Sequence, residues 1–136
     1  MPTMMIAVVD DDHRYLVQFA RMCQYSVPGA TVVGFTTVED FDRHLDALDQ
    51  CIIVLDLVLA GDSGLRVLAE VRRRRPTLPV IMISAHVTDE ARYAARRLGA
   101  AGFEDKPRDA DGMRALCNSV ARFSRSVDAA GLLSQG

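Results

Sequence analysis

The segment from Cys51 to Gly64, CIIVLDLVLAGDSG, constrains the fold more than any other part of the chain. Residues 51–55 are all apolar and three of them are Ile or Val, which is typical of a strand buried on both faces of a parallel sheet. A carboxylate, Asp56, follows at the predicted end of this strand. An unpaired buried carboxylate is costly, and open α/β sheets bind ligands at the carboxyl ends of their strands. We therefore predict that Asp56 lies at the ligand-binding edge of a parallel sheet.

Five segments of strand type, of which the first four are mainly apolar, alternate with segments of helical periodicity along the chain. The predicted strands are Met4–Val9, Thr31–Phe35, Cys51–Leu55, Pro79–Ile83 and Ala101–Asp105. Helical spacing follows each of them, over about residues 15–27, 38–48, 65–75, 89–98 and 110–123. This alternation predicts an α/β fold with a parallel sheet covered on both faces. We expect a flavodoxin-like, doubly wound (βα)5 arrangement with a five-stranded parallel sheet in the order 2-1-3-4-5, in which strands one and three are neighbours.

The length of 136 residues is that of one domain, which we predict to occupy residues 1–123. Residues 124–136 are mostly small and polar, which predicts a flexible tail or the stub of a linker. No apolar run is long enough to cross a bilayer, and residues 1–12 lack the features of a signal peptide. We therefore expect a cytoplasmic protein without a membrane contact.

The net charge of −2 is divided unevenly along the chain. Residues 1–65 carry ten acids and three bases, whereas residues 66–136 carry eight acids and thirteen bases. The first part is therefore suited to a cation and the second to an acidic partner surface.

Lys106 is the only lysine among sixteen basic residues, which reflects either chance or a requirement for a compact ammonium. Four consecutive arginines, 72–75, precede Pro76 and are interpreted as cations at a helix C-terminus rather than a nucleic-acid contact.

Three cysteines, Cys23, Cys51 and Cys117, are scattered through apolar segments. Their odd number and their spacing favour reduced thiols in the core over a disulfide framework or a metal site.

Polar side chains follow four of the predicted strands. They are Asp10 and Asp11 after strand one, Asp56 after strand three, Ser84 after strand four and Lys106 after strand five. In the predicted strand order the acids converge at one edge of the sheet. Two carboxylates about 4 Å apart repel by about 4 kcal/mol at an effective dielectric near 20, so a cation is needed there. Hard oxygen ligands favour Mg²⁺, and carboxylates, a divalent cation, a hydroxyl and a Lys are the groups that hold a phosphoryl group during attack by an oxygen nucleophile.

Four motifs at these strand ends resemble the receiver domain of two-component response regulators, over roughly residues 4–123. They are VVDDD, VLDLVLAGDSGL, MISA and GFEDKP, in this order. The resemblance implies that Asp56 accepts a phosphoryl group from a histidine kinase or phosphotransfer protein. It implies that Asp11, Asp56 and the backbone carbonyl of Val58 bind Mg²⁺ directly, and that Asp10 acts through a coordinated water.

The resemblance also assigns roles to residues of the last two strands. Lys106 would pair with Asp56 and then with the phosphoryl oxygens, Ser84 would swing inward to the phosphoryl group, and Phe103 would turn inward as a switch residue. The alternatives are a strand-end hydroxyl for Ser84 and a core side chain for Phe103. For Asp12 the preferred interpretation is a helix N-terminus.

An output face is implied at the fourth helix, the fifth strand and the fifth helix. Basic and acidic side chains of this face would meet across a phosphorylation-stabilised homodimer. They are Arg92, Arg96 and Arg97 on one copy and Glu104 and Asp105 on the other. Output would be the regulation of transcription through an effector domain outside this chain, which alone would contact DNA; the alternative is a stand-alone single-domain regulator.

The chain is expected to catalyse only its own phosphorylation and dephosphorylation, and so not to be an enzyme in the ordinary sense. A competing hypothesis is a small phosphatase of the haloacid dehalogenase type, because Asp10 and Asp12 also fit an Asp-x-Asp pair after a first strand. That hypothesis leaves Asp56 without a role. A receiver that only binds is disfavoured, because the acceptor, metal and Lys positions are all present.

Overall fold

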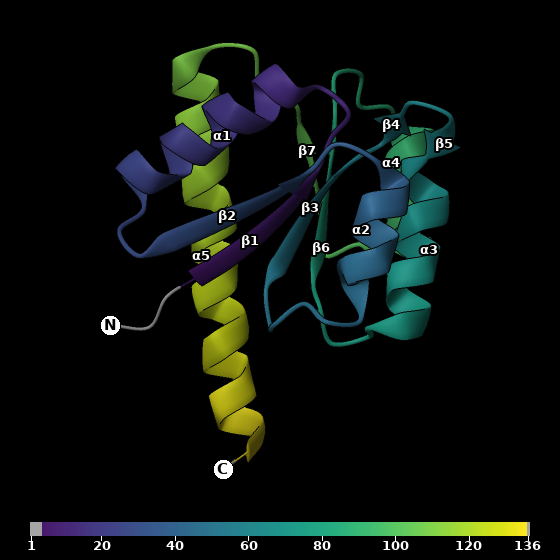
Figure 1. Ribbon diagram of the computed structural model, residues 1–136. Helices are drawn as coiled ribbons and strands as arrows, with labels where there is room; N and C mark the ends of the chain where they lie inside the picture. The colour runs from purple at the N-terminus through teal and green to yellow at the C-terminus, as the bar shows by residue number, and fades with distance from the viewer. Residues whose placement is uncertain (1–3, 136) are drawn as a thin grey trace.

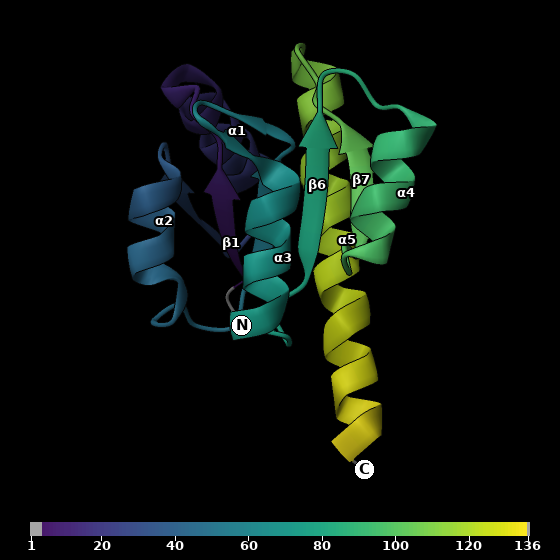
Figure 2. The same cartoon turned by 90° about the vertical axis from the view of Figure 1, so that its right-hand side faces the viewer.

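The computed structural model describes residues 4–135, of which 124–135 are described only as backbone. The elements are β1 (Met4–Val9), α1 (His13–Ser26), β2 (Ala30–Phe35), α2 (Val38–Leu45), β3 (Ile52–Asp56), β4 (Val58–Leu59), β5 (Asp62–Ser63), α3 (Gly64–Arg74), β6 (Val80–Ser84), α4 (Asp89–Arg97), β7 (Gly102–Asp105) and α5 (Ala110–Gln135). Five of the strands form a parallel sheet in the order β2-β1-β3-β6-β7, which is 2-1-3-4-5 when these strands are counted along the chain. Helices α1 and α5 cover one face and α2, α3 and α4 the other (Figures 1 and 2). The predicted α/β fold with five parallel strands and five helices is confirmed.

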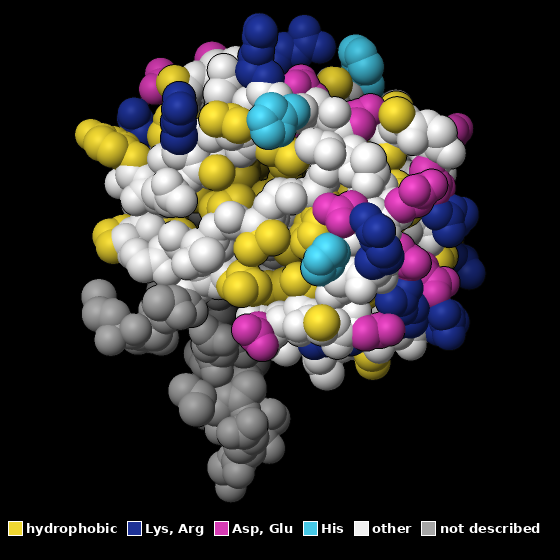
Figure 3. Space-filling view, in the orientation of Figure 1, with side chains coloured by type: hydrophobic (Ala, Val, Ile, Leu, Met, Phe, Trp, Pro, Cys, Tyr) yellow, Lys and Arg dark blue, Asp and Glu magenta, His cyan; other side chains and the backbone are white. Residues whose placement is uncertain are grey.

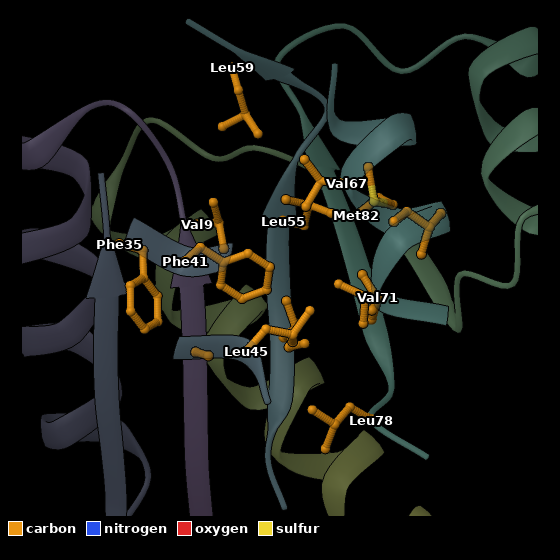
Figure 4. Packing of buried hydrophobic residues seen from close by; sticks show 14 of the residues in the cluster. Val9, Phe35, Phe41, Leu45, Leu55, Leu59, Val67, Val71, Leu78 and Met82 are labelled. Carbon is orange, nitrogen blue, oxygen red and sulfur yellow. The ribbon is translucent and has the colours of Figure 1, made fainter. Parts of the chain in front are cut away.

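The side chains of the central strands alternate between two cores, one on each face of the sheet. In β3, Ile53 and Leu55 pack towards α2 and α3, whereas Ile52 and Val54 pack towards α1 and α5. All five residues of this strand are buried, because helices cover both of its faces. Figure 4 shows the core on the side of α2 and α3, where apolar side chains of the strands and of both helices meet.

Short polar side chains begin most of the helices by accepting backbone N–H groups that have no partner within the helix. Asp12 accepts from Tyr15 at the start of α1, at 3.2 Å, and Thr37 accepts from Asp40 at the start of α2, at 3.1 Å. The interpretation of Asp12 as a helix N-terminal residue is confirmed.

The arginines at the end of α3 make contacts within the chain. Arg74 forms ion pairs with Asp42 and with Asp46 of the segment around α2, and Arg75 donates to the Leu45 carbonyl at 2.7 Å. Arg73 pairs with a glutamate one turn earlier in the same helix. Figure 3 shows acidic and basic side chains interspersed over this side of the molecule. These arginines thus lie at the end of a helix, as predicted, and two of them also join α3 to the segment around α2.

The last helix is longer than predicted. We expected helical structure to end at Phe123, but α5 continues to Gln135, past the lower end of the sheet in Figures 1 and 2. Extending an existing helix costs little, because no new nucleus is needed, and the added segment contains the strong helix formers Ala129, Ala130 and Leu132. The helix thus extends into the segment for which a flexible tail or the stub of a linker was predicted, and that role stays a prediction.

A small antiparallel hairpin between β3 and α3 was not predicted. It pairs β4 with β5, and Gly61 makes its turn with a φ of +74°, which favours glycine. Gly64 follows the hairpin and lies close to the backbone of Asp56 and Leu57. A Cβ at this position would lie 2.7 Å from the Leu57 Cα and would overlap the Asp56 carbonyl oxygen. The glycine thus allows α3 to begin directly beside the end of β3.

The three cysteines are buried and free, as predicted. The Sγ atoms of Cys23 in α1 and Cys117 in α5 lie 2.7 Å apart, so these thiols join the two helices in the core. Over residues 4–135, the structure contains no helix of the length and apolar character that crossing a membrane requires.

Candidate functional site

The register of the sheet brings two carboxylates to the same level. Val9 of β1 pairs with Leu55 of β3, and the next residues along these strands are Asp10 and Asp56. Both side chains follow the alternation of the buried residues that face α1 and α5. Their position at the carboxyl edge is therefore a direct result of parallel pairing between these strands.

Lys106 lies between these two carboxylates. Its Nζ is 2.9 Å from Asp56 Oδ2, to which it donates a hydrogen bond, and 2.7 Å from Asp10 Oδ2. The backbone positions the lysine, because the Lys106 N–H donates to the Ser84 carbonyl at 2.8 Å where β6 and β7 end. Asp10 is fully buried and Asp56 is only 6% exposed. One ammonium thus contacts two carboxylates in a largely dry environment.

The other oxygen atoms of these carboxylates are held by backbone donors. Asp10 Oδ1 accepts from the Asp12 N–H at 2.9 Å, and Asp56 Oδ1 accepts from the Val58 N–H at 3.0 Å. The Val58 side chain itself is 70% exposed beside the site. These backbone contacts orient both carboxylates.

Asp11 completes an acidic cluster with Asp10 and Asp56. Each of the three offers a carboxylate oxygen, and these atoms all lie within 4.8 Å of one another. Asp11 is exposed, and its Oδ2 accepts from the Ala60 N–H at 3.1 Å, which connects it to the hairpin. The structure therefore gathers the acids of strands one and three and the lysine of the last strand at one edge.

The electrostatics of this cluster favour an additional cation. Burial raises the pKa of Asp10 above its ordinary value, although Lys106 and the Asp12 N–H act in the opposite direction. Burial also opposes the charge of Lys106, but the two carboxylates outweigh it and raise the pKa of this lysine. Three acidic side chains thus surround one lysine.

Asp10 Oδ2 has an ion-pair partner but no well-directed donor. Lys106 approaches it at 2.7 Å, yet among the described residues this buried oxygen accepts no hydrogen bond of good geometry. A small cation, with the water molecules that it holds, would satisfy such an atom. The donor set and its charge therefore fit a hard divalent ion.

Ser84 and Phe103 do not join this cluster in the structure. The Ser84 hydroxyl donates to the His86 carbonyl and accepts from the His86 N–H, both at 3.1 Å, so it is a strand-end hydroxyl bonded to the backbone. Phe103 is buried in the core on the side of α3 and α4. Arg92 of α4 donates to the Phe103 carbonyl at 3.2 Å, and its guanidinium lies 5.8 Å from the centre of the ring. The arrangement seen here thus matches the two alternatives, which are a strand-end hydroxyl for Ser84 and a core side chain for Phe103.

One residue of the site was not identified from the sequence. The ring centre of Tyr15, in α1, lies 4.5 Å from Lys106 Nζ. Its place on the apolar stripe of a helix is typical of any core aromatic, so the sequence contains no signal for this contact.

Comparisons with known proteins agree with this geometry. A family model described as the response regulator receiver domain matches residues 6–118. The chain is 29% identical over 119 residues to the transcriptional regulatory protein BasR of Escherichia coli (strain K12), covering 88% of this chain and 53% of that protein. It is 33% identical over 112 residues to the DNA-binding transcriptional regulator NtrC of Klebsiella pneumoniae, covering 80% of this chain and 23% of that protein. The chain thus spans about half or less of the length of these relatives.

Solved structures show the same fold. The response regulator DrrB of Thermotoga maritima superimposes with a TM-score of 0.70 at 29% identity, covering 84% of this chain and 50% of that chain. The signal receiver domain of a LuxO repressor protein from Vibrio parahaemolyticus gives a TM-score of 0.83 at 22% identity, covering 97% of this chain and 98% of that chain. Since the family model covers most of the sequence, this chain belongs to the receiver domain family of two-component response regulators and is related to transcriptional regulators.

Proposed function

We propose that this chain is a phospho-accepting receiver in which Asp56 takes up the phosphoryl group. The position of Lys106 carries the proposal, because its ammonium lies 2.9 Å from Asp56 Oδ2 and 2.7 Å from Asp10 Oδ2. A carboxylate oriented beside a fixed ammonium is prepared to act as a nucleophile towards phosphorus, since the ammonium can follow the charge onto the phosphoryl oxygens.

The phosphoryl donor would be the phosphohistidine of a sensor histidine kinase or a phosphotransfer protein. An Asp56 carboxylate oxygen forms the new O–P bond as the P–N bond breaks, and the bonding pair stays on the histidine nitrogen. The product is an acyl phosphate on Asp56. Its phosphoryl oxygens add negative charge beside Asp10 and Asp11, which Lys106 only partly offsets.

Mg²⁺ is the cation that this donor set fits best. Asp11, Asp56 and the backbone carbonyl of Val58 would hold it directly, and Asp10 would act through a bound water. Support comes from the three carboxylates within 4.8 Å of one another and from the buried Asp10 Oδ2, which has no well-directed donor among the described residues. When bound, the ion offsets the charge of the acids and of the incoming phosphoryl oxygens.

We infer that the chain acts on its own aspartate and not on a separate substrate. The phosphatase hypothesis needs Asp10 and Asp12 as a catalytic pair, but the Asp12 side chain accepts the Tyr15 N–H and caps α1. Asp56, which that hypothesis leaves without a role, has the ammonium beside it. These contacts favour the receiver.

Phosphorylation is proposed to act on the face formed by α4, β7 and α5. Ser84 would exchange its contacts with the His86 backbone for the phosphoryl group, which would pull on the segment that leads into α4. Phe103, proposed as the switch residue, starts from a buried position under Arg92. Its further inward movement on phosphorylation stays a prediction.

The output is proposed to be the control of transcription by a cytoplasmic regulator. Support comes from the longer transcriptional regulators that the chain resembles, of which it spans about half or less. The DNA contact would belong to an effector domain outside this chain.

Incubation with acetyl phosphate and Mg²⁺ tests the proposal. We expect the intact mass to rise by one phosphoryl group, and the gain to be lost in Asp56→Asn and strongly slowed in Lys106→Ala. Asp40→Asn, an exposed acid of α2 paired with Arg43, serves as the matched control and should be labelled like the parent. Label retained in Asp56→Asn, or repeated turnover that depends on Asp10, would contradict the receiver and favour the phosphatase.

A further inference from the structure

The aromatic ring of Tyr15 lies beside the Lys106 ammonium. Its centre lies 4.5 Å from Nζ, and the residue is only 7% exposed. Asp10 and Asp56 approach the same ammonium at 2.7 and 2.9 Å. A ring face carries partial negative charge and attracts a cation, and the attraction is stronger where water is excluded.

A contact with the ring would limit the conformational freedom of the Lys106 side chain. A lysine side chain has four rotatable bonds and loses considerable rotamer freedom when it is held in one position. Here its side chain is 18% exposed and spans from the end of β7 to acids of two other strands. A flat surface beside the ammonium restricts the positions that it can take without forming a further ion pair.

The ring is itself held in place from the acidic side of the site. Asp12 donates its N–H to Asp10 Oδ1 at 2.9 Å and accepts the Tyr15 N–H at 3.2 Å. Farther along α1, the ring of Phe19 stacks on that of Tyr15, with centres 6.3 Å apart. The same short turn that orients Asp10 thus also orients the ring under Lys106.

The hydroxyl of Tyr15 takes no part in this arrangement. It is buried and has no hydrogen-bond partner among the described residues. Burial, with a smaller effect of the nearby Asp10, raises the pKa of Tyr15, so the phenol stays neutral. The contact with the ammonium is therefore made by the face of a neutral ring, which a phenylalanine also possesses.

We propose that Tyr15 is a positioning residue for phosphoryl transfer, whose ring holds the Lys106 ammonium between Asp10 and Asp56. The proposal rests on the function proposed above. It assigns the ring, and not the hydroxyl, to this role.

The test compares rates of phosphorylation by acetyl phosphate in the presence of Mg²⁺. Tyr15→Leu, which removes the ring, should lower the rate about tenfold, the size expected when a cation loses a buried ring face. Tyr15→Phe should keep the rate of the parent. Tyr25→Leu, the same change at a position of α1 that is 83% exposed, serves as the matched control and should have no effect.

A double-mutant cycle separates positioning from a general loss of structure. In a Lys106→Ala background, Tyr15→Leu should cause no further decrease, because the group that the ring positions is already absent. An equal tenfold decrease in both backgrounds would show that Tyr15 acts through folding alone and would overturn the proposal. A Tyr15→Phe variant as slow as Tyr15→Leu would overturn it too, since the hydroxyl would then be required.

The outcomes also separate this proposal from the function on which it rests. A parent protein that is labelled on Asp56, together with a Tyr15→Leu variant that is labelled equally fast, would remove the role of Tyr15 and leave the receiver intact. A parent protein that takes up no phosphoryl group would remove both.

Discussion

The Lys106 ammonium lies 2.7 Å from Asp10 Oδ2, a carboxylate oxygen that no well-directed donor satisfies in the described part of the chain, although Asp10 is fully buried. The ion pair therefore offsets only part of the cost of removing this carboxylate from water. The raised pKa of Asp10 has the same cause, which is burial. An acid kept in such a position is typical of a site that sacrifices stability for function.

Asp10→Asn is expected to stabilise the protein near pH 7 by about 1 kcal/mol, because it removes a buried charge from a cluster of like charges. Since folding raises the pKa of Asp10, the protonated carboxyl stabilises the fold at pH values below the ordinary carboxyl pKa, and this contribution is lost as the pH rises through the raised value. The advantage of the variant should therefore shrink towards zero as the pH falls to about 4. Chemical denaturation at both pH values measures it.

Asp111→Asn is the control for this prediction, because its side chain is 95% exposed. It should change stability little at either pH. Mg²⁺ should raise the melting temperature of the parent and have a much smaller effect on Asp10→Asn. An Asp10→Asn variant that is less stable than the parent near pH 7 would contradict the uncompensated cost that we infer for burying this carboxylate.

Gly64→Ala is expected to destabilise the protein by about 2–3 kcal/mol, because the new Cβ would lie 2.7 Å from the Leu57 Cα and would overlap the Asp56 carbonyl. The displaced backbone also carries the acceptor, so phosphorylation should slow. Gly102→Ala is the matched control, since its Cβ would meet only Ile81, at 3.8 Å. Urea denaturation of both variants tests the prediction, and equal stabilities would count against the close approach.

Val58→Asn is expected to shorten the lifetime of the acyl phosphate several-fold. Val58 follows the acceptor by two residues, and its exposed apolar side chain lies at the edge of the site. An amide at this position can hydrogen-bond an attacking water, whereas the valine offers it no partner. Val58→Leu, which keeps an apolar side chain, should lose its phosphate no faster than the parent. The decay of the phosphorylated mass after removal of the donor measures both, and an unchanged decay in Val58→Asn would remove the hypothesis.

Arg96 is expected to contribute most to the homodimer that we propose through α4, β7 and α5. Among the three arginines of α4, Arg92 already contacts Phe103, and Arg97 lies over the ring of Tyr93. Arg96 has no ion-pair partner in the described residues, and the same is true of two exposed acids of β7, Glu104 and Asp105. The phosphorylated protein should therefore dimerise through charges that are free in the monomer.

Sedimentation velocity with beryllofluoride and Mg²⁺ tests this interface. Dimer formation should be weakened about tenfold by Arg96→Glu, because two like charges then face each other. Arg43→Glu, which changes an exposed arginine of α2 at the opposite end of the sheet from α4 and β7, should dimerise like the parent. A parent protein that stays monomeric under these conditions would exclude the proposed dimer.

The sequence alone predicted the strands of the main sheet, the helices between them and the polar groups at the strand ends. Buried strands are recognisable by their continuous apolar character, and acids placed directly after them, such as Asp10 and Asp56, stand out because such runs rarely end in a charge. The start of α1 at Asp12 was predictable for a similar reason, since capping is a local interaction. Features that depend on residues close in sequence were therefore accessible before the structure.

The contacts between distant elements were decided by the tertiary structure. Pairing of Val9 with Leu55 sets Asp10 level with Asp56, and the Lys106 ammonium reaches both only because β6 and β7 end together. The sequence contained no signal for the contact between the Tyr15 ring and that ammonium. An aromatic residue on the apolar stripe of a helix has the same spacing whether it contacts a lysine or a leucine. Local periodicity determined which residues are buried, whereas strand register and helix packing, which join residues up to a hundred positions apart, determined which of them meet.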